Sequence, residues 1–158
     1  MQQYPQFRKY INCFLFENIE EVTKKFMGLL KDYRICEFSE LVSKKKNPFA
    51  NHQEQLLAFF NGIIQEDPLR QPQEIIDHWR NSELHSDCNF HPILPEDIIA
   101  YYTVLNETLL HFIPTYDSDQ EKSFVLQEEL NALESAIQKI IAQSFLQWQD
   151  ELHGQKGQ

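Results

Sequence analysis

The sequence predicts an all-α protein, a bundle of five helices in which the first and last are long. Three observations lead to this fold class. Apolar residues recur at steps of three and four over long stretches, the spacing of one face of an α-helix. Glycine is scarce, at four residues, whereas the many turns of all-β folds usually need more. Prolines stand between the periodic stretches, where they end one helix or begin the next.

The first predicted helix covers about residues 6–33. Its apolar stripe advances by three or four residues, with one step of five. The stripe consists of Phe7, Tyr10, Ile11, Phe14, Ile19, Val22, Phe26, Leu29 and Tyr33. Because the stripe is continuous, it predicts one long helix, straight or kinked. Pro48 then breaks the pattern, since proline disfavours helix at the residue before it.

Two shorter helices are predicted next, over about residues 51–66 and 72–83. The first has a broad apolar face, which predicts a central position. That face consists of Leu56, Leu57, Phe59, Phe60, Ile63 and Ile64. Pro72 suits the first turn of the second helix, where its missing N–H costs nothing. The predicted buried side of this helix consists of Ile75, Ile76 and Trp79.

The fourth and fifth helices are predicted over about residues 95–113 and 119–152. Pro95 begins the fourth, Pro114 ends it, and its buried side is Ile98, Tyr102, Leu105, Leu109 and Phe112. The fifth carries the stripe Leu126, Leu130, Leu133, Ile137, Ile141, Phe145, Trp148 and Leu152. A strict heptad would place Ser144 and Glu151 in the seam, which disfavours a coiled coil. The sequence predicts a nearly straight helix of about 50 Å that ends at Gly154.

Composition and charge limit the classes of partner and the location expected for the predicted single domain, residues 1–158. The net charge of -10 repels phosphate backbones and anionic lipids, so neither nucleic acid nor a membrane is predicted as a partner. The basic run Lys44–Lys46 is interpreted as a solvated loop edge. Three cysteines without a pairing frame indicate reduced thiols and a cytoplasmic location. Neither a signal peptide nor a membrane span is found.

The loop ELHSDCNFHP holds the strongest candidates for a ligand site, His85, Cys88 and His91. Imidazole and thiolate are zinc ligands, and Asp87, Glu83 or His52 are candidates for the fourth position. Structural zinc sites usually show two pairs of ligands, however, and the second pair is missing here. The preferred interpretation is therefore a polar interhelical loop, with no metal assigned. A redox role for Cys88 is the alternative, because a nearby imidazolium lowers a thiol pKa.

Other histidines and the carboxylates give no enzyme signature. His78 and His111 lie within predicted helices, where a haem ligand and a half-buried, hydrogen-bonded side chain are both open interpretations. The chain lacks a glycine-rich phosphate loop, a nucleophile elbow and an HExxH pair. We therefore expect a non-enzymatic protein without a cofactor.

Four segments carry a resemblance to a known family. They are ENIEEVTKKFMGLLKDY, NPFAN with QLLAFFNGII, EIIDHWR with LPEDIIAYYTVLNETLLHFI, and ELNALESAIQKIIAQSFLQWQDEL. In this order, over about nine-tenths of the chain, they resemble the N-terminal sensor domain of the RsbR and RsbRD proteins of the bacterial stressosome. Related domains precede some bacterial histidine kinases. Asn47–Asn51 is the most specific match, and Arg80 matches a basic position at the end of the third major helix.

The resemblance implies a globin-like fold without haem, a homodimer, and a regulatory role in stress signalling. Two departures are visible: the loop from His85 to Pro92 is longer than usual, and the sequence stops where an output domain would begin. A module of this kind is expected to act by contact with a regulatory protein. Two other functions stay open. One is a metal- or redox-responsive sensor that uses the His85, Cys88 and His91 loop, and the other is a helical chaperone or adaptor for a redox enzyme.

Overall fold

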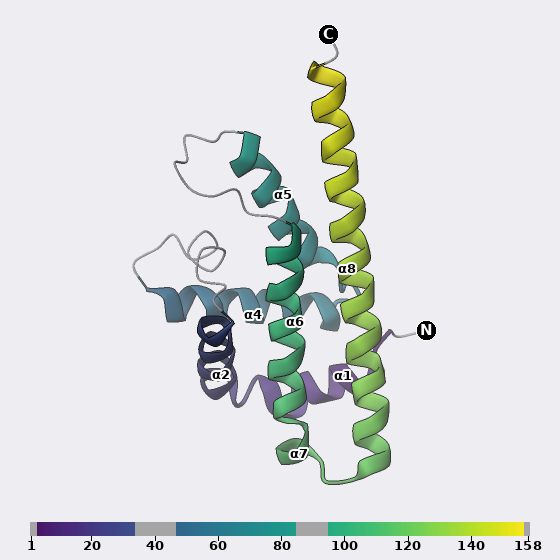
Figure 1. Ribbon diagram of the computed structural model, residues 1–158. Coiled ribbons are helices and arrows are strands. Elements are labelled where there is room, and N and C mark those ends of the chain that lie inside the picture. The colour runs from purple at the N-terminus through teal and green to yellow at the C-terminus, as the bar shows by residue number, and fades with distance from the viewer. Residues whose placement is uncertain (1–2, 34–46, 85–94, 157–158) are drawn as a thin grey trace.

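The computed structural model describes residues 3–33, 47–84 and 95–156 of the chain (Figure 1). Every regular element within these ranges is a helix, which confirms the all-α prediction. The sequence also predicted long first and last helices, and only the last of these is found. None of the described helices combines the length and apolar character needed to cross a lipid bilayer.

The prediction of one long helix over about residues 6–33 is wrong, because the structure divides this stretch into three elements. Helix α1 covers Pro5–Tyr10, a π-helix η1 covers Ile11–Leu15, and helix α2 covers Ile19–Asp32. The backbone leaves the helical region at Asn18 (φ -114°, ψ 23°), immediately before α2. As a result, α1 runs across the view in Figure 1, whereas α2 is seen nearly end-on.

The π-helix also changes which side chains face the core. A π-turn holds an extra residue, shown here by the bond from the Phe16 N–H to the Ile11 carbonyl (3.1 Å). Leu15 is therefore fully buried while the predicted Phe14 is half-buried. In α2 the buried leucine is Leu30 instead of Leu29, and Tyr33 is exposed.

Helix α4 covers Pro48–Ile64, and α5 covers Arg70–Leu84. Asn47 caps α4, since its side-chain oxygen accepts a hydrogen bond from the Ala50 N–H (3.2 Å). The turn between the helices closes tightly, with the Asp67 N–H donating to the Gly62 carbonyl (2.8 Å). A Cβ at Gly62 would lie 2.9 Å from the Asp67 carbonyl oxygen, so only glycine fits this approach.

The last three helices are α6 (Pro95–His111), α7 (Ile113–Tyr116) and α8 (Gln120–Lys156). Pro114 was predicted to end the fourth helix, and α6 does end just before it, at His111, while Pro114 itself lies in the first turn of α7. The long last helix is confirmed, although it passes through Gly154, where it was predicted to end. Asp119 caps α8, because its carboxylate accepts from the Glu121 N–H (2.9 Å).

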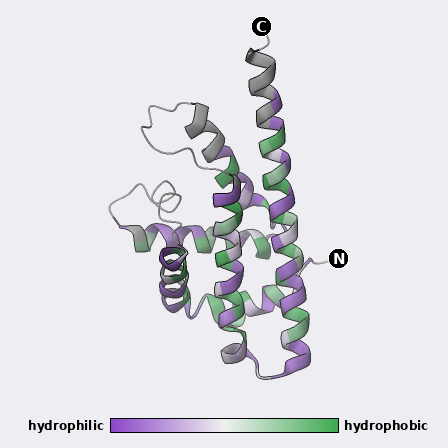
Figure 2. Cartoon of the chain, in the orientation of Figure 1, coloured by the Kyte–Doolittle hydropathy of each residue, from purple (hydrophilic) through white to green (hydrophobic). Residues whose placement is uncertain are grey.

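The core lies between α8, α6 and the N-terminal helices. The most extensive helix–helix contact joins α6 to α8, and α2 packs against both α6 and α4. Figure 2 shows apolar and polar residues alternating along α6 and α8, as expected for helices buried on one side. Of the stripe predicted for α8, five residues are buried and Phe145 is half-buried, while the side chains of Trp148 and Leu152 lie outside the description. The five buried residues are Leu126, Leu130, Leu133, Ile137 and Ile141.

Buried tyrosines connect the helices through their hydroxyl groups. The Tyr10 hydroxyl donates to the Leu109 carbonyl (2.6 Å), and the Tyr102 hydroxyl donates to the Gln71 side chain (2.6 Å). Burial raises the pKa of both phenols above the ordinary value, so both remain neutral donors. These bonds satisfy polar atoms that would otherwise be costly inside the core.

Candidate functional site

The loop that carried the strongest sequence-based candidates is not among the described residues. His85, Cys88 and His91 lie outside them, as do Asp87 and the basic run Lys44–Lys46. Glu83 belongs to α5, but its side chain is outside the description as well. The preferred interpretation, a polar loop without a metal, and the alternative of a metal or redox site therefore both stay predictions.

His52 was the distant candidate for a fourth metal ligand, and the structure places it inside the helical body. It lies in the first turns of α4, almost fully buried, with its ring edge-on to Phe26 at 5.9 Å between centroids. Burial lowers the pKa of its imidazole, because the charged form loses hydration there. Within the described ranges, no group of three His, Cys, Asp or Glu side chains is placed to hold a metal ion.

The two histidines considered as haem ligands both face solvent. His78 is exposed on α5, and His111 is exposed at the end of α6, where its ring contacts Phe112 (5.0 Å between centroids). Neither side chain faces the core, where a haem would have to lie. Cys13 is exposed on η1.

What the structure brings together instead lies along α8. The first part of this helix is fastened to the helical body by polar bonds. Glu129 supplies the cap that α1 lacks in its own sequence: its carboxylate accepts from the N–H groups of Gln6 (2.9 Å) and Phe7 (3.0 Å). Nearby, Asn106 of α6 donates to Glu134 of α8 (2.6 Å).

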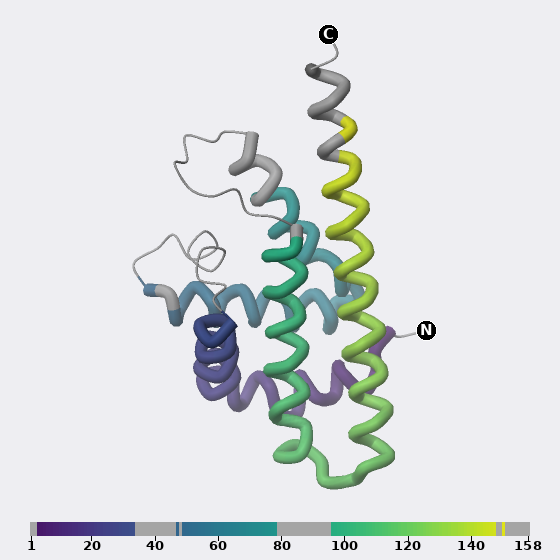
Figure 3. The backbone as a smooth tube through the Cα atoms, viewed as in Figure 1, coloured from purple at the N-terminus to yellow at the C-terminus, as the bar shows by residue number. Residues whose placement is uncertain are grey.

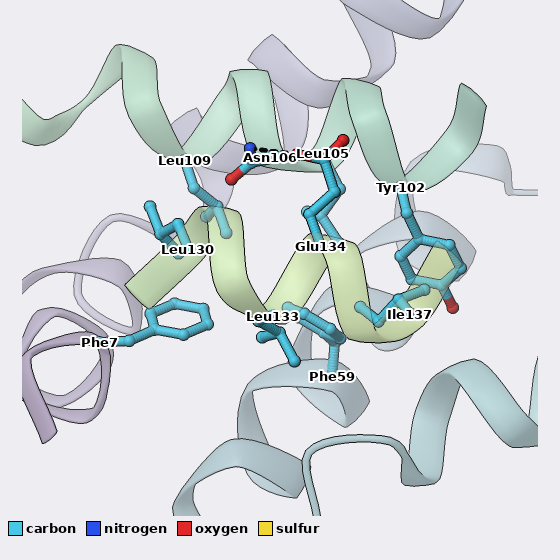
Figure 4. A pocket seen from close by; sticks show the side chains of 10 residues that line it. All are labelled: Phe7, Phe59, Tyr102, Leu105, Asn106, Leu109, Leu130, Leu133, Glu134 and Ile137. Carbon is cyan, nitrogen blue, oxygen red and sulfur yellow. Dashed lines mark hydrogen bonds between the residues drawn. The ribbon is translucent and has the colours of Figure 1, made fainter. Parts of the chain in front are cut away.

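Apolar packing beneath these bonds leaves little internal space. Figure 4 shows the side chains around the hollow between α6 and α8, with Phe7 and Phe59 entering from α1 and α4. The hollow measures about 10 Å³, which is room for about one water molecule. This part of the interior is therefore filled by side chains and has no space for a small-molecule ligand.

The second part of α8 begins under the cover of the other helices, with Ile137 and Ile141 buried, and leads into the end of α8 that extends beyond α6. The tube in Figure 3 shows α6 running antiparallel to α8 and α8 continuing past the start of α6. The stretch of residues 135–149 contains one charged residue, Lys139, in a chain whose net charge is -10. By contrast, residues 117–134 contain six acidic residues and one lysine.

Three of the four large apolar side chains that are exposed in the described part belong to α8. They are Phe124, Val125 and Leu146, with Tyr33 the fourth. Phe124 and Leu146 are equally exposed, at 60%. None of the three was predicted as a functional residue, although the sequence holds a signal for them: all three are apolar residues that lie off the buried stripe of α8.

The pattern of segments that resembles the RsbR and RsbRD sensor domains has no counterpart in the comparisons. No protein family, curated protein or solved structure matches this chain. Within the described residues, α8 carries the exposed apolar side chains and the uneven charge that distinguish one part of the surface from another.

Proposed function

We propose that this protein is a non-enzymatic regulatory module that forms a homodimer through the second part of α8 and acts by contact with another protein. The regulatory role, the homodimer and a globin-like fold without haem are what the resemblance to the RsbR and RsbRD sensor domains implies. The observation that carries the dimer is the exposed face of residues 135–149, which holds no carboxylate and a single charged residue, Lys139, with Leu146 exposed at 60%.

Charge supports this choice of surface. A twofold dimer brings the same surface of both copies together, so any charge on it faces its own kind. For a chain of net charge -10, most surfaces would bring carboxylates together, which costs free energy. Residues 135–149 avoid that cost because Lys139 is their only charged residue.

The side chains of this surface also suit a helix–helix contact. Lys139, Ala142, Gln143 and Leu146 are exposed and, with Ser135, follow one another along one face of α8. Serine and alanine are small, so a second helix can approach closely, and Leu146 supplies apolar area to bury. Burying one leucine side chain contributes roughly 1.5–3 kcal/mol, and a twofold dimer contains the residue twice.

Leu146→Gln tests the dimer, with Phe124→Gln as the matched control. Both replace an equally exposed apolar residue on the same helix by the same uncharged side chain. We expect sedimentation of the wild-type chain to show a dimer at micromolar concentration. Leu146→Gln should raise the dissociation constant by about tenfold or more, since each 1.4 kcal/mol is a factor of ten.

Phe124→Gln should leave the dissociation constant of the dimer within about twofold of the wild-type value, because the residue lies at the other end of α8. A wild-type chain that sediments as a monomer at high micromolar concentration contradicts the dimer outright. Equal dissociation constants for the wild type and Leu146→Gln would show that a different surface is used.

A further inference from the structure

The corner where α7 meets the start of α8 carries two neighbouring exposed apolar side chains, Phe124 and Val125. Beside Phe124 lies a hollow of about 470 Å³ that opens to solvent. Ile113 and Pro114 of α7 form its apolar wall, and Ser123 and Gln127 contribute polar edges. Its volume is within the roughly 300–1,000 Å³ range of ligand sites, which is ample for the side chains of a bound peptide.

Carboxylates stand on both sides of Phe124. Glu121 precedes it by three residues and Glu128 follows it by four, so both lie on the same face of α8, about one turn away on either side. Both are exposed. The positive end of the helix dipole stabilises Glu121, which lies in the first turn of α8. Glu128 lies beyond the first turn, so the dipole does not account for an acidic residue there.

We propose that this corner, defined by Phe124, Val125, Glu121, Glu128 and the hollow beside α7, docks a partner protein that presents a basic amphipathic helix. This docking role rests on the proposed regulatory function and names the chemistry of the partner. An apolar side chain of the partner enters the hollow against Phe124. Lysine or arginine on adjacent turns of the partner then meets Glu121 and Glu128.

Charge argues against a second copy of this chain as the occupant. Residues 117–134 carry six acidic residues and one lysine, so a symmetric contact here would set like charges against each other. The same balance attracts a basic partner and raises its association rate. The surface around Leu146, in residues 135–149, has no acidic residue and one lysine, and it lies farther along the same helix.

Fluorescence anisotropy with the full chain and a labelled synthetic peptide tests the docking. The peptide is a helix of leucine and lysine with one apolar face, and its counterpart has the same composition in scrambled order. We expect the wild-type chain to bind the amphipathic peptide about tenfold more tightly than the scrambled one, because only the former buries an apolar face. Phe124→Gln should weaken binding of the amphipathic peptide by about tenfold.

Two further variants separate the apolar part of the contact from the charged part. Glu121→Gln combined with Glu128→Gln should weaken binding and reduce its dependence on salt, since two screened attractions are lost. Leu146→Gln should leave the affinity for the peptide within about twofold of the wild-type value. Circular dichroism of each variant verifies that the helices are retained.

Four results would overturn the docking site. They are no binding of the amphipathic peptide by the wild-type chain, equal binding of the scrambled peptide, equal binding by Phe124→Gln, and dissociation of the homodimer by Phe124→Gln. The last would assign this corner to a second copy. Failure of the proposed dimer is a separate outcome: there, Leu146→Gln leaves sedimentation unchanged while peptide binding still depends on Phe124.

Discussion

The two parts of α8 share one helix and one buried stripe, yet they present opposite surfaces. Residues 117–134 are acidic, and α6 and α1 hold this part through Asn106 and through the α1 N–H groups that Glu129 caps. Residues 135–149 carry one charge. Ile137 and Ile141 still bury this part in the core, and α8 then continues past the start of α6. The first part is thus held by polar bonds as well as by apolar packing, whereas the second part is held by its apolar stripe.

This difference shows how an acidic protein can separate two kinds of contact along one helix. Repulsion between like charges disfavours contact between two copies over most of an acidic surface, and residues 135–149 of α8 have no carboxylate to contribute to that repulsion. A basic partner has the reverse preference, because it gains from the carboxylates of the first part. The uneven distribution of charge therefore places the two proposed contacts, with a second copy and with a basic partner, on different parts of one helix.

The largest expected effect compares two leucines of α8. Leu133 is 2% exposed and lines the filled hollow of Figure 4, whereas Leu146 is 60% exposed. Leu133→Ala should lower the free energy of unfolding by about 2–5 kcal/mol, through lost burial and the cavity left behind. Leu146→Ala should change it by less than about 0.5 kcal/mol when the chain is dilute enough to be monomeric. Urea denaturation measures both, and equal losses would mean that Leu146 itself is buried in the body.

A smaller effect is expected from two adjacent glutamates in the acidic part. Glu129→Ala removes the acceptor for the Gln6 and Phe7 N–H groups, and it should cost about 1–2 kcal/mol of stability. Glu128→Ala is the control, because that side chain is exposed and should change stability by no more than about 0.5 kcal/mol. Thermal unfolding of the pair measures the difference. Matching losses would show that the cap contributes nothing beyond the removal of one acid.

The smallest effect concerns the single charged residue of the second part. Lys139→Glu would replace the positive charge on the proposed dimer surface by a negative one in a chain whose net charge is already -10. The added repulsion between two acidic copies should raise the dissociation constant a few-fold, in line with about 0.2–1 kcal/mol for exposed charges. Lys122→Glu makes the same change in the acidic part and should leave the dimer intact. Sedimentation at low salt measures both, and the effect of Lys139→Glu should shrink as salt is added. A dimer that is indifferent to Lys139→Glu would place the contact elsewhere.

Much of the fold could be predicted from the sequence because apolar spacing reports the helix face directly. The stripe from Leu126 to Ile141 is buried as predicted, and so is the broad face of α4 at Phe59 and Phe60. The first predicted helix failed because neither glycine nor proline marks its break. A weaker signal was present: Asn18, followed by Glu20 and Glu21, fits the start of a new helix.

The candidate site was harder to predict than the fold. The sequence directed attention to His85, Cys88 and His91, which lie outside the described residues, and to His52, which the structure buries against Phe26. Chemical type alone suggested these residues, since imidazole and thiolate are ligands wherever they gather. Exposure of Phe124 and Leu146 depends on which helices cover α8 and where they end, and residue types do not report that.

The sequence by itself determined that the chain is helical, where most helices run, and that the charge along α8 is uneven. Each of these properties is written in the order of neighbouring residues, within one or two helical turns. Only the tertiary structure decided that the chain turns between η1 and α2 and that Glu129 caps a helix 122 residues away in sequence. It also decided that α8 extends beyond the start of α6. Those outcomes depend on contacts between segments far apart in the chain, and local periodicity carries no record of them.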